Sequence, residues 1–395
     1  MKAIKNSLHI AYQYLKYHKI RTVILIVALS IIIFVPFLLD MVVQESQSRL
    51  NARAESTPLI LGEKGSSLDL AINSLYFIAK RPGDITMADI DLIDDTELAY
   101  AIPLYTRFSA GKHTIVGTTI DYVDLRKLSL SGGRMFTILG EAVIGSKVAD
   151  ELNLTVGDTL ISSPENLFDL AGQYPLQMKI VGVLASSGTS DDEVIITDIA
   201  TTWAMTGMFH GHKDLAKTED KSVIIKREKG SVVANAKLKT YTVITQDNLK
   251  SFHFHGSQTT FPATSAIVVP EDAKSKTILL GRHQEHPENM QLIQPKMVVQ
   301  ELILSILRIK RTLDTIIITV SVSTLMTIAL VFLLSIRLRE KEIKTIFRLG
   351  CSRMATSGFI AAEILIIAVT SITLAGVLFM LTWSQSDMLI KQLIS

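Results

Sequence analysis

The sequence predicts an α-helical membrane protein with three transmembrane helices and a large mixed α/β domain outside the membrane. Hydrophobic residues make up 48% of the 395 positions and charged residues only 20%, with a mean hydropathy of +0.34. The apolar residues gather in three uncharged runs, over residues 22–39, 315–336 and 364–383. At about 1.5 Å per residue, each run spans about 27–33 Å, the thickness of a bilayer core.

The charge balance excludes several protein classes. The chain has 40 Lys+Arg against 38 Asp+Glu, so it lacks the basic excess of a nucleic-acid-binding module. Its high apolar content is not that of a disordered segment or of an ordinary soluble enzyme. We therefore expect no nucleic-acid partner and a lipid bilayer as the surroundings of the three runs.

The N-terminal region predicts an uncleaved membrane anchor. Basic residues precede the first apolar run, and no acidic residue occurs before Asp40. The run is longer than the h-region of a signal peptide, and no small-x-small cleavage site follows it. We expect residues 1–20 to form an amphipathic helix at the interface and residues 21–43 to form transmembrane helix 1, bent at Pro36.

The distribution of Lys and Arg predicts the orientation. With the basic N-terminus in the cytoplasm, residues 44–312 lie outside, residues 313–336 return as transmembrane helix 2, and the loop 337–353 is inside. This loop is rich in Lys and Arg, as the positive-inside rule requires. Residues 354–383 then form transmembrane helix 3, and 384–395 form an outer tail. Arg308, Lys310 and Arg311 do not follow this rule, because they lie at the outer end of the second span.

The outer segment mixes helical and extended patterns. Residues 44–54 continue the first span as a helical stalk, and Thr86 is expected to cap a helix that reaches Asp95. Short β-branched runs predict strands, and residues 297–313 carry apolar residues at helical spacing and lead into the second span as a second stalk. The predicted strands cover 113–117, 179–184, 222–226, 241–245 and 265–270.

The order of parts and two sequence stretches resemble the MacB, LolC and FtsX type (type VII) of ABC transporter permease. The first stretch is Gly132-Gly-Arg-Met-Phe136, followed by residues 141–158 and 180–184. The second stretch is 337–352 with Glu363 further on. The resemblance implies a MacB-like periplasmic domain, an elbow helix over 1–20 and a coupling helix in 337–353 that meets a separate ATPase. The family normally has a fourth span, which these three apolar runs do not supply.

The basic segment 337–353 has two interpretations from its residues alone. Apolar side chains among charges, with Gly350 as a stop, suit docking into a groove on a partner protein. A positive loop resting on lipid headgroups would have the same composition. The resemblance favours docking, and the residues it assigns to ATPase coupling are Arg339, Glu340, Glu342, Lys344, Phe347, Arg348, Leu349 and Gly350.

No catalytic motif emerges, and we predict a non-catalytic subunit. The sequence lacks the G-x-x-x-x-G-K-[ST] motif, so ATP hydrolysis is expected in a partner chain and this chain is expected to bind no ATP cofactor. Asp191-Asp-Glu193 is either an acidic turn or a site for a hard cation. Glu363 is either functional, because carboxylates at membrane depth are costly, or a headgroup-level residue.

Six histidines form three close pairs in the outer segment, and such pairs suit zinc or copper. In an extended Phe252-His-Phe-His255 segment, both histidines would share one face. Exposed loops that simply carry histidine are the alternative. The candidate zinc ligands are His210, His212, His253, His255, His283 and His286.

The resemblance thus implies a dimeric permease subunit of the bacterial inner membrane, multi-pass, with its large domain in the periplasm. An ABC ATPase would drive movement of the outer domain, for transport or extraction of a periplasmic or membrane substrate, with a link to zinc handling as a further hypothesis. The expected partners are the ATPase, a second copy or related permease, and a periplasmic binding partner. The alternatives are an FtsX-like regulator of an outer enzyme and a ligand-sensing membrane module.

Overall fold

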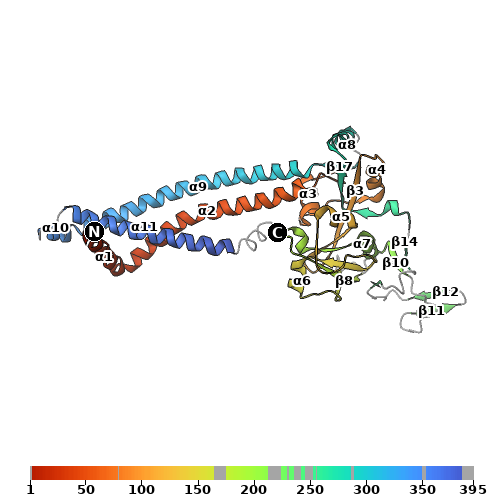
Figure 1. The fold of residues 1–395 in the computed structure, drawn as a ribbon, viewed down its shortest axis with the longest axis horizontal. Helices are drawn as coiled ribbons and strands as arrows, with labels where there is room; N and C mark the ends of the chain where they lie inside the picture. The colour runs from red at the N-terminus through yellow and green to blue at the C-terminus, as the bar shows by residue number, and fades with distance from the viewer. Residues whose placement is uncertain are drawn as a thin grey trace. The chain divides into compact units, whose positions relative to one another are not determined.

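The computed structural model describes residues 2–78, 80–163, 175–211, 224–228, 231–234, 242–244, 252–254, 256–285, 289–348 and 353–384. The chain divides into two compact units (Figure 1). One unit, the helical unit, comprises residues 1–48 and 302–395. The other, the outer domain, comprises residues 49–301.

The described part of the helical unit consists of three long helices and two short ones. Within the described chain, three helices are long and apolar enough to cross a membrane, over Lys19–Glu55, Pro295–Leu338 and Ser357–Trp383. Together with the α/β outer domain, they confirm the predicted fold class. The helices are α1 (Lys2–Tyr17), α2 (Lys19–Glu55), α9 (Pro295–Leu338), α10 (Glu340–Arg348) and α11 (Arg353–Ser384).

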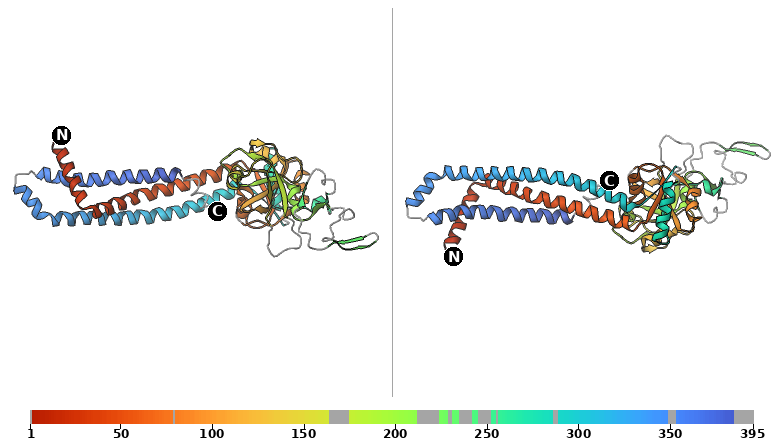
Figure 2. Two further views of the ribbon diagram at one scale, coloured as in Figure 1. Left: turned by 90° about the horizontal axis from the view of Figure 1, so that it is seen from below. Right: turned by 90° about the horizontal axis from the view of Figure 1, so that it is seen from above.

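The three long helices lie side by side in both views of Figure 2. Leu25 of α2 and Ile367 of α11 are buried in one small apolar cluster with Leu15 of α1. The Ser30 hydroxyl on α2 donates a 3.0 Å hydrogen bond to the Ser371 carbonyl on α11. Pro36 lies inside α2 without ending it, although proline removes a backbone donor.

Lys310 belongs to the basic cluster at 308–311, which the positive-inside rule does not predict at this end of the second span. Its Nζ lies 2.7 Å from Asp40 Oδ1 on α2 and 2.9 Å from Asp314 Oδ2 one turn further along α9. Two carboxylates therefore neutralise this lysine. The positive-inside rule counts loop charges and does not detect such pairing between spans.

The outer domain is organised around a mixed sheet of eleven strands. Its main order is β13-β8-β6-β9-β4-β3-β16-β1-β17, and β5 and β7 also pair with β8. The strands of this sheet are β1 (Leu59–Glu63), β3 (Ala99–Ala110), β4 (His113–Thr118), β5 (Leu130–Gly133), β6 (Glu141–Ile144), β7 (Thr159–Ile161), β8 (Leu176–Leu184), β9 (Ile195–Asp198), β13 (Thr242–Val243), β16 (Ser265–Pro270) and β17 (Met290–Ile293).

Three two-stranded pairs and several short helices complete the described part of the outer domain. The additional strands are β2 (Ile85–Thr86), β10 (Phe209–Gly211), β11 (Ile224–Glu228), β12 (Ser231–Ala234), β14 (Phe252–Phe254) and β15 (Pro262–Ala263). The helices are α3 (Ser67–Tyr76), α4 (Met87–Asp94), α5 (Ile120–Arg126), α6 (Ser146–Leu152), α7 (Ile199–Met205) and α8 (Ala273–Glu285), with 3₁₀ turns η1 (Ser190–Glu193) and η3 (Gln258–Thr260).

Both faces of the large sheet are buried along its central strands. Successive side chains of a strand point to opposite faces, and on β4 Ile115 belongs to one apolar core while Val116 belongs to a second. The first core includes Trp203 of α7, and the second includes Tyr122 of α5. Strands such as β16 are apolar at nearly every position because each face of the sheet packs against an apolar core. A sheet with one exposed face would instead alternate apolar and polar residues.

Several predicted elements are confirmed with small shifts. Helix α4 begins after Thr86, whose side chain accepts a hydrogen bond from the Asp89 amide, while Asp89 accepts one from the Thr86 amide. This reciprocal arrangement is a capping box. The strands expected over 113–117 and 265–270 are β4 and β16. The strand expected over 222–226 overlaps β11 at residues 224–226, and residues 222 and 223 lie outside the described residues.

The Gly-Gly-Arg motif ends strand β5, where Gly132 and Gly133 pair with β8. Gly133 has a φ of +82°, and a Cβ there would lie 2.2 Å from the Val181 carbonyl oxygen, so only glycine fits. The following Arg134 forms an ion pair with Glu141, with Nη1 2.7 Å from Oε2. The motif thus ties β5 to the start of β6.

Candidate functional site

Helix α10 is the short basic helix that the sequence assigned to coupling. Glu340 and Lys344 form an ion pair of 2.6 Å one turn apart, and both side chains are mostly exposed. The hydrogen bond and charge of Lys344 lower the pKa of the Glu340 carboxyl. Such exposed pairs contribute little to stability, because water and salt screen the two charges. These two charged side chains of α10 are therefore solvent-exposed.

The structure distributes the eight predicted coupling residues unevenly. Glu340, Lys344 and Arg348 are exposed on α10. Glu342 and Phe347 lie within α10, where the structure describes their backbone alone. Leu349 and Gly350 lie outside the described residues. Arg339 differs from these, because its side chain is only 13% exposed and turns back into the helical unit.

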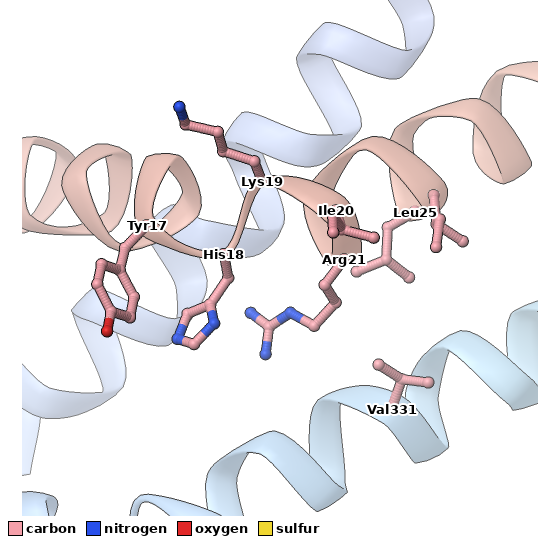
Figure 3. A pocket seen from close by; sticks show the side chains of 8 residues that line it. Tyr17, His18, Lys19, Ile20, Arg21, Leu25 and Val331 are labelled. Carbon is pink, nitrogen blue, oxygen red and sulfur yellow. The ribbon is translucent and has the colours of Figure 1, made fainter.

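Arg339 takes part in a buried cluster around Glu363. The Glu363 carboxylate on α11 is 1% exposed, and its Oε1 lies 2.6 Å from Arg21 Nη2 on α2. Its Oε2 lies 3.2 Å from Arg339 Nη2. Figure 3 shows the Arg21 guanidinium between α2 and α9. Glu363, which sequence reasoning left open between two interpretations, is thus an internal ion-pair partner.

Further contacts connect α1 and α9 to the cluster. Ser335 of α9 accepts hydrogen bonds from Arg21 at 2.6 Å and from Arg339 at 2.9 Å. The Arg339 guanidinium carbon lies 3.5 Å from the centre of the Tyr14 ring on α1, a cation–π contact. Arg339 immediately precedes α10, so the coupling candidate begins at a residue that touches α1, α9 and α11.

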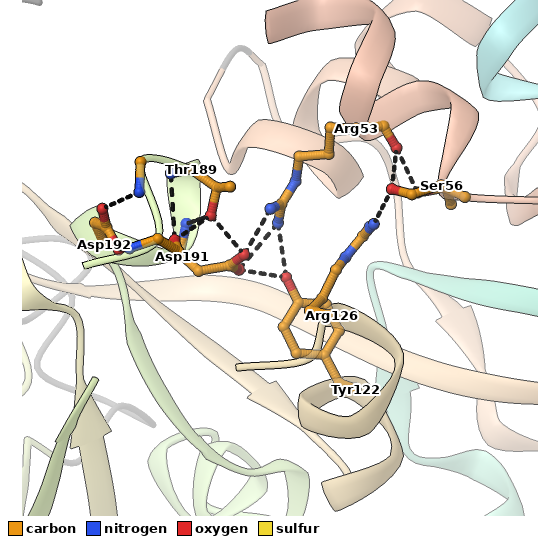
Figure 4. Close-up of polar contacts among 10 residues, drawn as sticks. Arg53, Ser56, Tyr122, Arg126, Thr189, Asp191 and Asp192 are labelled. Carbon is orange, nitrogen blue, oxygen red and sulfur yellow. Dashed lines mark hydrogen bonds and ion pairs between the residues drawn. The ribbon is translucent and has the colours of Figure 1, made fainter. Parts of the chain in front are cut away.

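A second buried cluster holds the end of α2 inside the outer domain (Figure 4). Arg53 is 7% exposed, and its guanidinium makes two hydrogen bonds to Asp191 of η1, at 2.6 and 3.0 Å. Arg53 Nη2 also donates to the Tyr122 hydroxyl at 2.8 Å, and that hydroxyl donates to Asp191 at 2.6 Å. A bidentate, charge-assisted pair of this kind fixes orientation as well as distance.

The electrostatics of Asp191 follow from its neighbours. Burial alone raises the pKa of the carboxyl, but the charge and hydrogen bonds of Arg53 and the Tyr122 hydroxyl outweigh burial, so the pKa is lowered from its ordinary value. Asp191 is therefore ionised at neutral pH. Sequence reasoning had no signal for this pair, because Arg53 and Asp191 are far apart in the chain.

The acidic turn at 191–193 is occupied by protein contacts. Asp192 accepts hydrogen bonds from the Ser187 amide and the Gly188 amide, both at 2.8 Å. Glu193 forms an ion pair of 3.0 Å with Lys147. Since Asp191 binds Arg53, all three carboxylates have partners within the domain. These contacts favour the interpretation of 191–193 as an acidic turn over its interpretation as a cation site.

The histidine pairs are only partly described. Strand β10 pairs with β14 so that His210 lies directly opposite His253. His212, His255 and His286 lie outside the described residues, and His283 is half-buried on α8, with Nδ1 3.2 Å from the Leu279 carbonyl oxygen. Among the described residues, no group of three or more His, Cys, Asp or Glu side chains is arranged to hold a metal.

Comparison with known proteins gives a family match and a set of structural neighbours. The family model of the MacB-like periplasmic core domain matches residues 22–239. No curated protein matches the chain. The chain is similar to the crystal structure of the periplasmic region of MacB from Actinobacillus actinomycetemcomitans, with 11% identity, a TM-score of 0.34 and coverage of 64% of this chain and 97% of that one. It is also similar to the extracellular domain of the noncanonic ABC-type transporter YknZ from Gram-positive bacteria, with 15% identity, a TM-score of 0.32 and coverage of 60% and 98%.

Proposed function

Because the chain belongs to the family that carries the MacB-like periplasmic core domain, we propose that it is the permease subunit of an ABC transporter. The observation that carries this proposal is the family match itself, which runs from the first apolar helix through most of the α/β domain. The subunit is non-catalytic, and a separate ATPase supplies the energy. The membrane is the bacterial inner membrane, with the outer domain in the periplasm.

The two buried clusters support mechanical coupling along α2. Arg21 near the start of this helix is bound to Glu363, and Arg53 near its end is bound to Asp191. Helix α2 is continuous across Pro36, which removes one backbone donor, and the other hydrogen bonds between successive turns keep the helix stiff along its axis. A displacement at the Glu363 cluster is thus carried along α2 to a residue that is fixed in the outer domain.

Helix α10 is the proposed contact with the ATPase. Its exposed Lys344 and Arg348 suit an acidic groove, and Arg339 links it directly to the Glu363 cluster. ATP-driven closure of two ATPases would draw together the α10 helices of two permease chains, either a homodimer or a pair with a related permease. The work would be done on a substrate outside the membrane or within its outer leaflet.

Charge reversal on α10 tests this proposal. Lys344→Glu with Arg348→Glu in the full-length chain is expected to release the co-expressed ATPase, since like charges across an interface are repelled. The measurement is ATPase recovery after affinity purification of the permease, together with membrane insertion of the variant. Purified wild-type permease alone is expected to hydrolyse no ATP.

Lys16→Glu is the matched control, because Lys16 is an exposed base at the end of α1. It changes charge near the same end of the helical unit but not on α10, and should retain the ATPase. Full ATPase recovery with the α10 double variant would remove the coupling assignment. Equal loss from both variants would show a general electrostatic effect and would also contradict it.

A zinc site in the outer domain is a second candidate function, favoured by the register of β10 and β14. Residues directly opposite in an antiparallel pair have Cβ atoms about 5 Å apart, which lets two imidazoles share one metal ion. His210 and His253 occupy such positions. His212 and His255 are the expected further ligands, with His283 and His286 as the remaining candidates.

Full-length protein is expected to bind Zn²⁺ near pH 7.5 and to lose it as the pH falls through about 6.5, because only neutral imidazole is a ligand. His210→Ala with His253→Ala should weaken binding at least tenfold in titration calorimetry. His9→Ala, on α1, is the control and should bind zinc as wild type does. Absent saturable binding to the wild type, or unchanged binding to the double variant, would remove the zinc hypothesis.

A further inference from the structure

A recess opens in the helical unit where α1 meets α2 and α9. It has a volume of about 760 Å³, and its lining combines apolar side chains with three basic ones (Figure 3). Ile24, Leu25 and Val331 form the apolar wall, and His18, Lys19 and Arg21 provide the basic groups. A volume of this size is within the range of about 300–1,000 Å³ of small-molecule sites.

The basic groups are not fully neutralised. Arg21 shares the single carboxylate of Glu363 with Arg339, so two guanidinium groups face one negative charge. Arg21 Nε is buried and has no hydrogen-bond acceptor among the described residues. In Figure 3 the Arg21 guanidinium and the His18 ring lie in the same space, while the Lys19 ammonium points outward from the recess.

The recess lies at the polarity boundary of α2. Lys19 and Arg21 occupy the first turn of this helix, His18 directly precedes it, and Ile24 and Leu25 lie in the apolar run that crosses the membrane. A ligand that spans this boundary needs an anionic group at one end and a hydrocarbon chain at the other. Lysine stems are long and flexible, so Lys19 can reach a headgroup at the rim.

We propose that this recess binds one anionic phospholipid. The phosphate lies against Arg21 and Lys19, and an acyl chain lies along Ile24 and Val331. This site requires only that the chain is inserted in a membrane, and it does not depend on the ATPase partner. Loss of lipid binding and loss of ATPase co-purification are therefore separate results.

The test uses full-length protein in a neutral detergent, with phosphatidylglycerol as the probe and phosphatidylcholine as the uncharged comparison. Native mass spectrometry measures the lipid that each variant retains. Phosphatidylglycerol is expected to be retained in preference to phosphatidylcholine, at one molecule per chain. Lys19→Gln should weaken its retention about fivefold, the effect of one basic residue near an anionic lipid.

Lys16→Gln is the matched control, because Lys16 is exposed but does not line the recess. Val331→Trp fills the recess without changing charge and should abolish selective retention; Ile24→Trp is a second filling variant in case the first is not monodisperse. Equal retention of the two lipids, equal effects of Lys16→Gln and Lys19→Gln, or displacement by millimolar inorganic phosphate would overturn the proposal. The proposal would also be overturned if the filling variants changed only the oligomeric state. That result would show that the recess is an interface between two copies of the chain.

Discussion

Replacing Asp191 with alanine is expected to destabilise the outer domain by about 3–5 kcal/mol, the cost of leaving one buried charge without its partner. Arg53 and Asp191 are both nearly inaccessible to solvent. Without Asp191, water could not replace the carboxylate as the acceptor for the Arg53 guanidinium. The measurement is urea unfolding of the full-length chain, followed by Trp203 fluorescence in a Trp383→Phe background. Trp203 is buried in the sheet core and so reports on this domain.

Glu55→Gln is the control for this prediction. Glu55 forms an ion pair of 3.0 Å with Lys296, but both side chains are about half exposed, so its loss should cost less than about 1 kcal/mol. Arg53→Ala alone should resemble Asp191→Ala, and the double variant should cost clearly less than the sum of the two. Additive losses would show that the pair is not coupled and would contradict this account.

The same carboxylate gives a pH dependence of known sign. Because the pKa of Asp191 is lower in the folded state than in the unfolded state, its contribution is fully present above the ordinary aspartate pKa of about 4. That contribution is lost as the pH falls below this value. Wild-type stability should therefore fall more steeply in acid than the stability of Asp191→Asn. Parallel curves for the two proteins would contradict the assignment.

Replacing Glu363 with alanine is expected to have the largest effect in the helical unit. Arg21 and Arg339 would both lose their carboxylate, and two guanidinium groups would be left close together. A cost of about 3–5 kcal/mol corresponds to a fall of about 6–20 °C in unfolding temperature. The measurement is the fraction of detergent-solubilised full-length protein that stays monodisperse after heating.

Glu340→Ala is the matched control, because Glu340 is exposed and pairs only with Lys344 among the described contacts. It should leave the unfolding temperature within about 1–2 °C of wild type. The α10 surface remains intact in Glu363→Ala, so the ATPase should still co-purify while its turnover no longer responds to the permease. A variant as heat-stable as wild type would show that the cluster contributes little to stability.

The sequence was informative about the local features of this fold. Uncharged runs located the three long helices, and Thr86 with Asp89 placed the start of α4, because capping depends on residues three positions apart. The chain order of basic and apolar segments also led to the family. All of these signals are carried by residues that are near one another in the sequence.

The arrangement of the sheet and the two buried clusters was not predictable in the same way. Strand β16 pairs with β3 and β1, which are more than 150 residues earlier, and no local pattern specifies such a partner. The pairing of Arg53 with Asp191 was not predicted either. In the sequence, Arg53 is one base in a helical stalk, and Asp191 belongs to an acidic turn. Their pairing depends on where the sheet brings η1, which the sequence alone did not reveal.

The pairing of β1 with β17 has a consequence for the history of the chain. The two strands are the first and last of the outer domain, and they are hydrogen-bonded neighbours with Ile60 opposite Ile293. Paired antiparallel residues lie only about 5 Å apart, so the domain leaves and rejoins its host chain almost at one point. A segment with adjacent ends can be gained, lost or exchanged by recombination without stretching the chain on either side. The adjacent ends therefore meet the geometric requirement for replacing the outer domain while the long helices are kept.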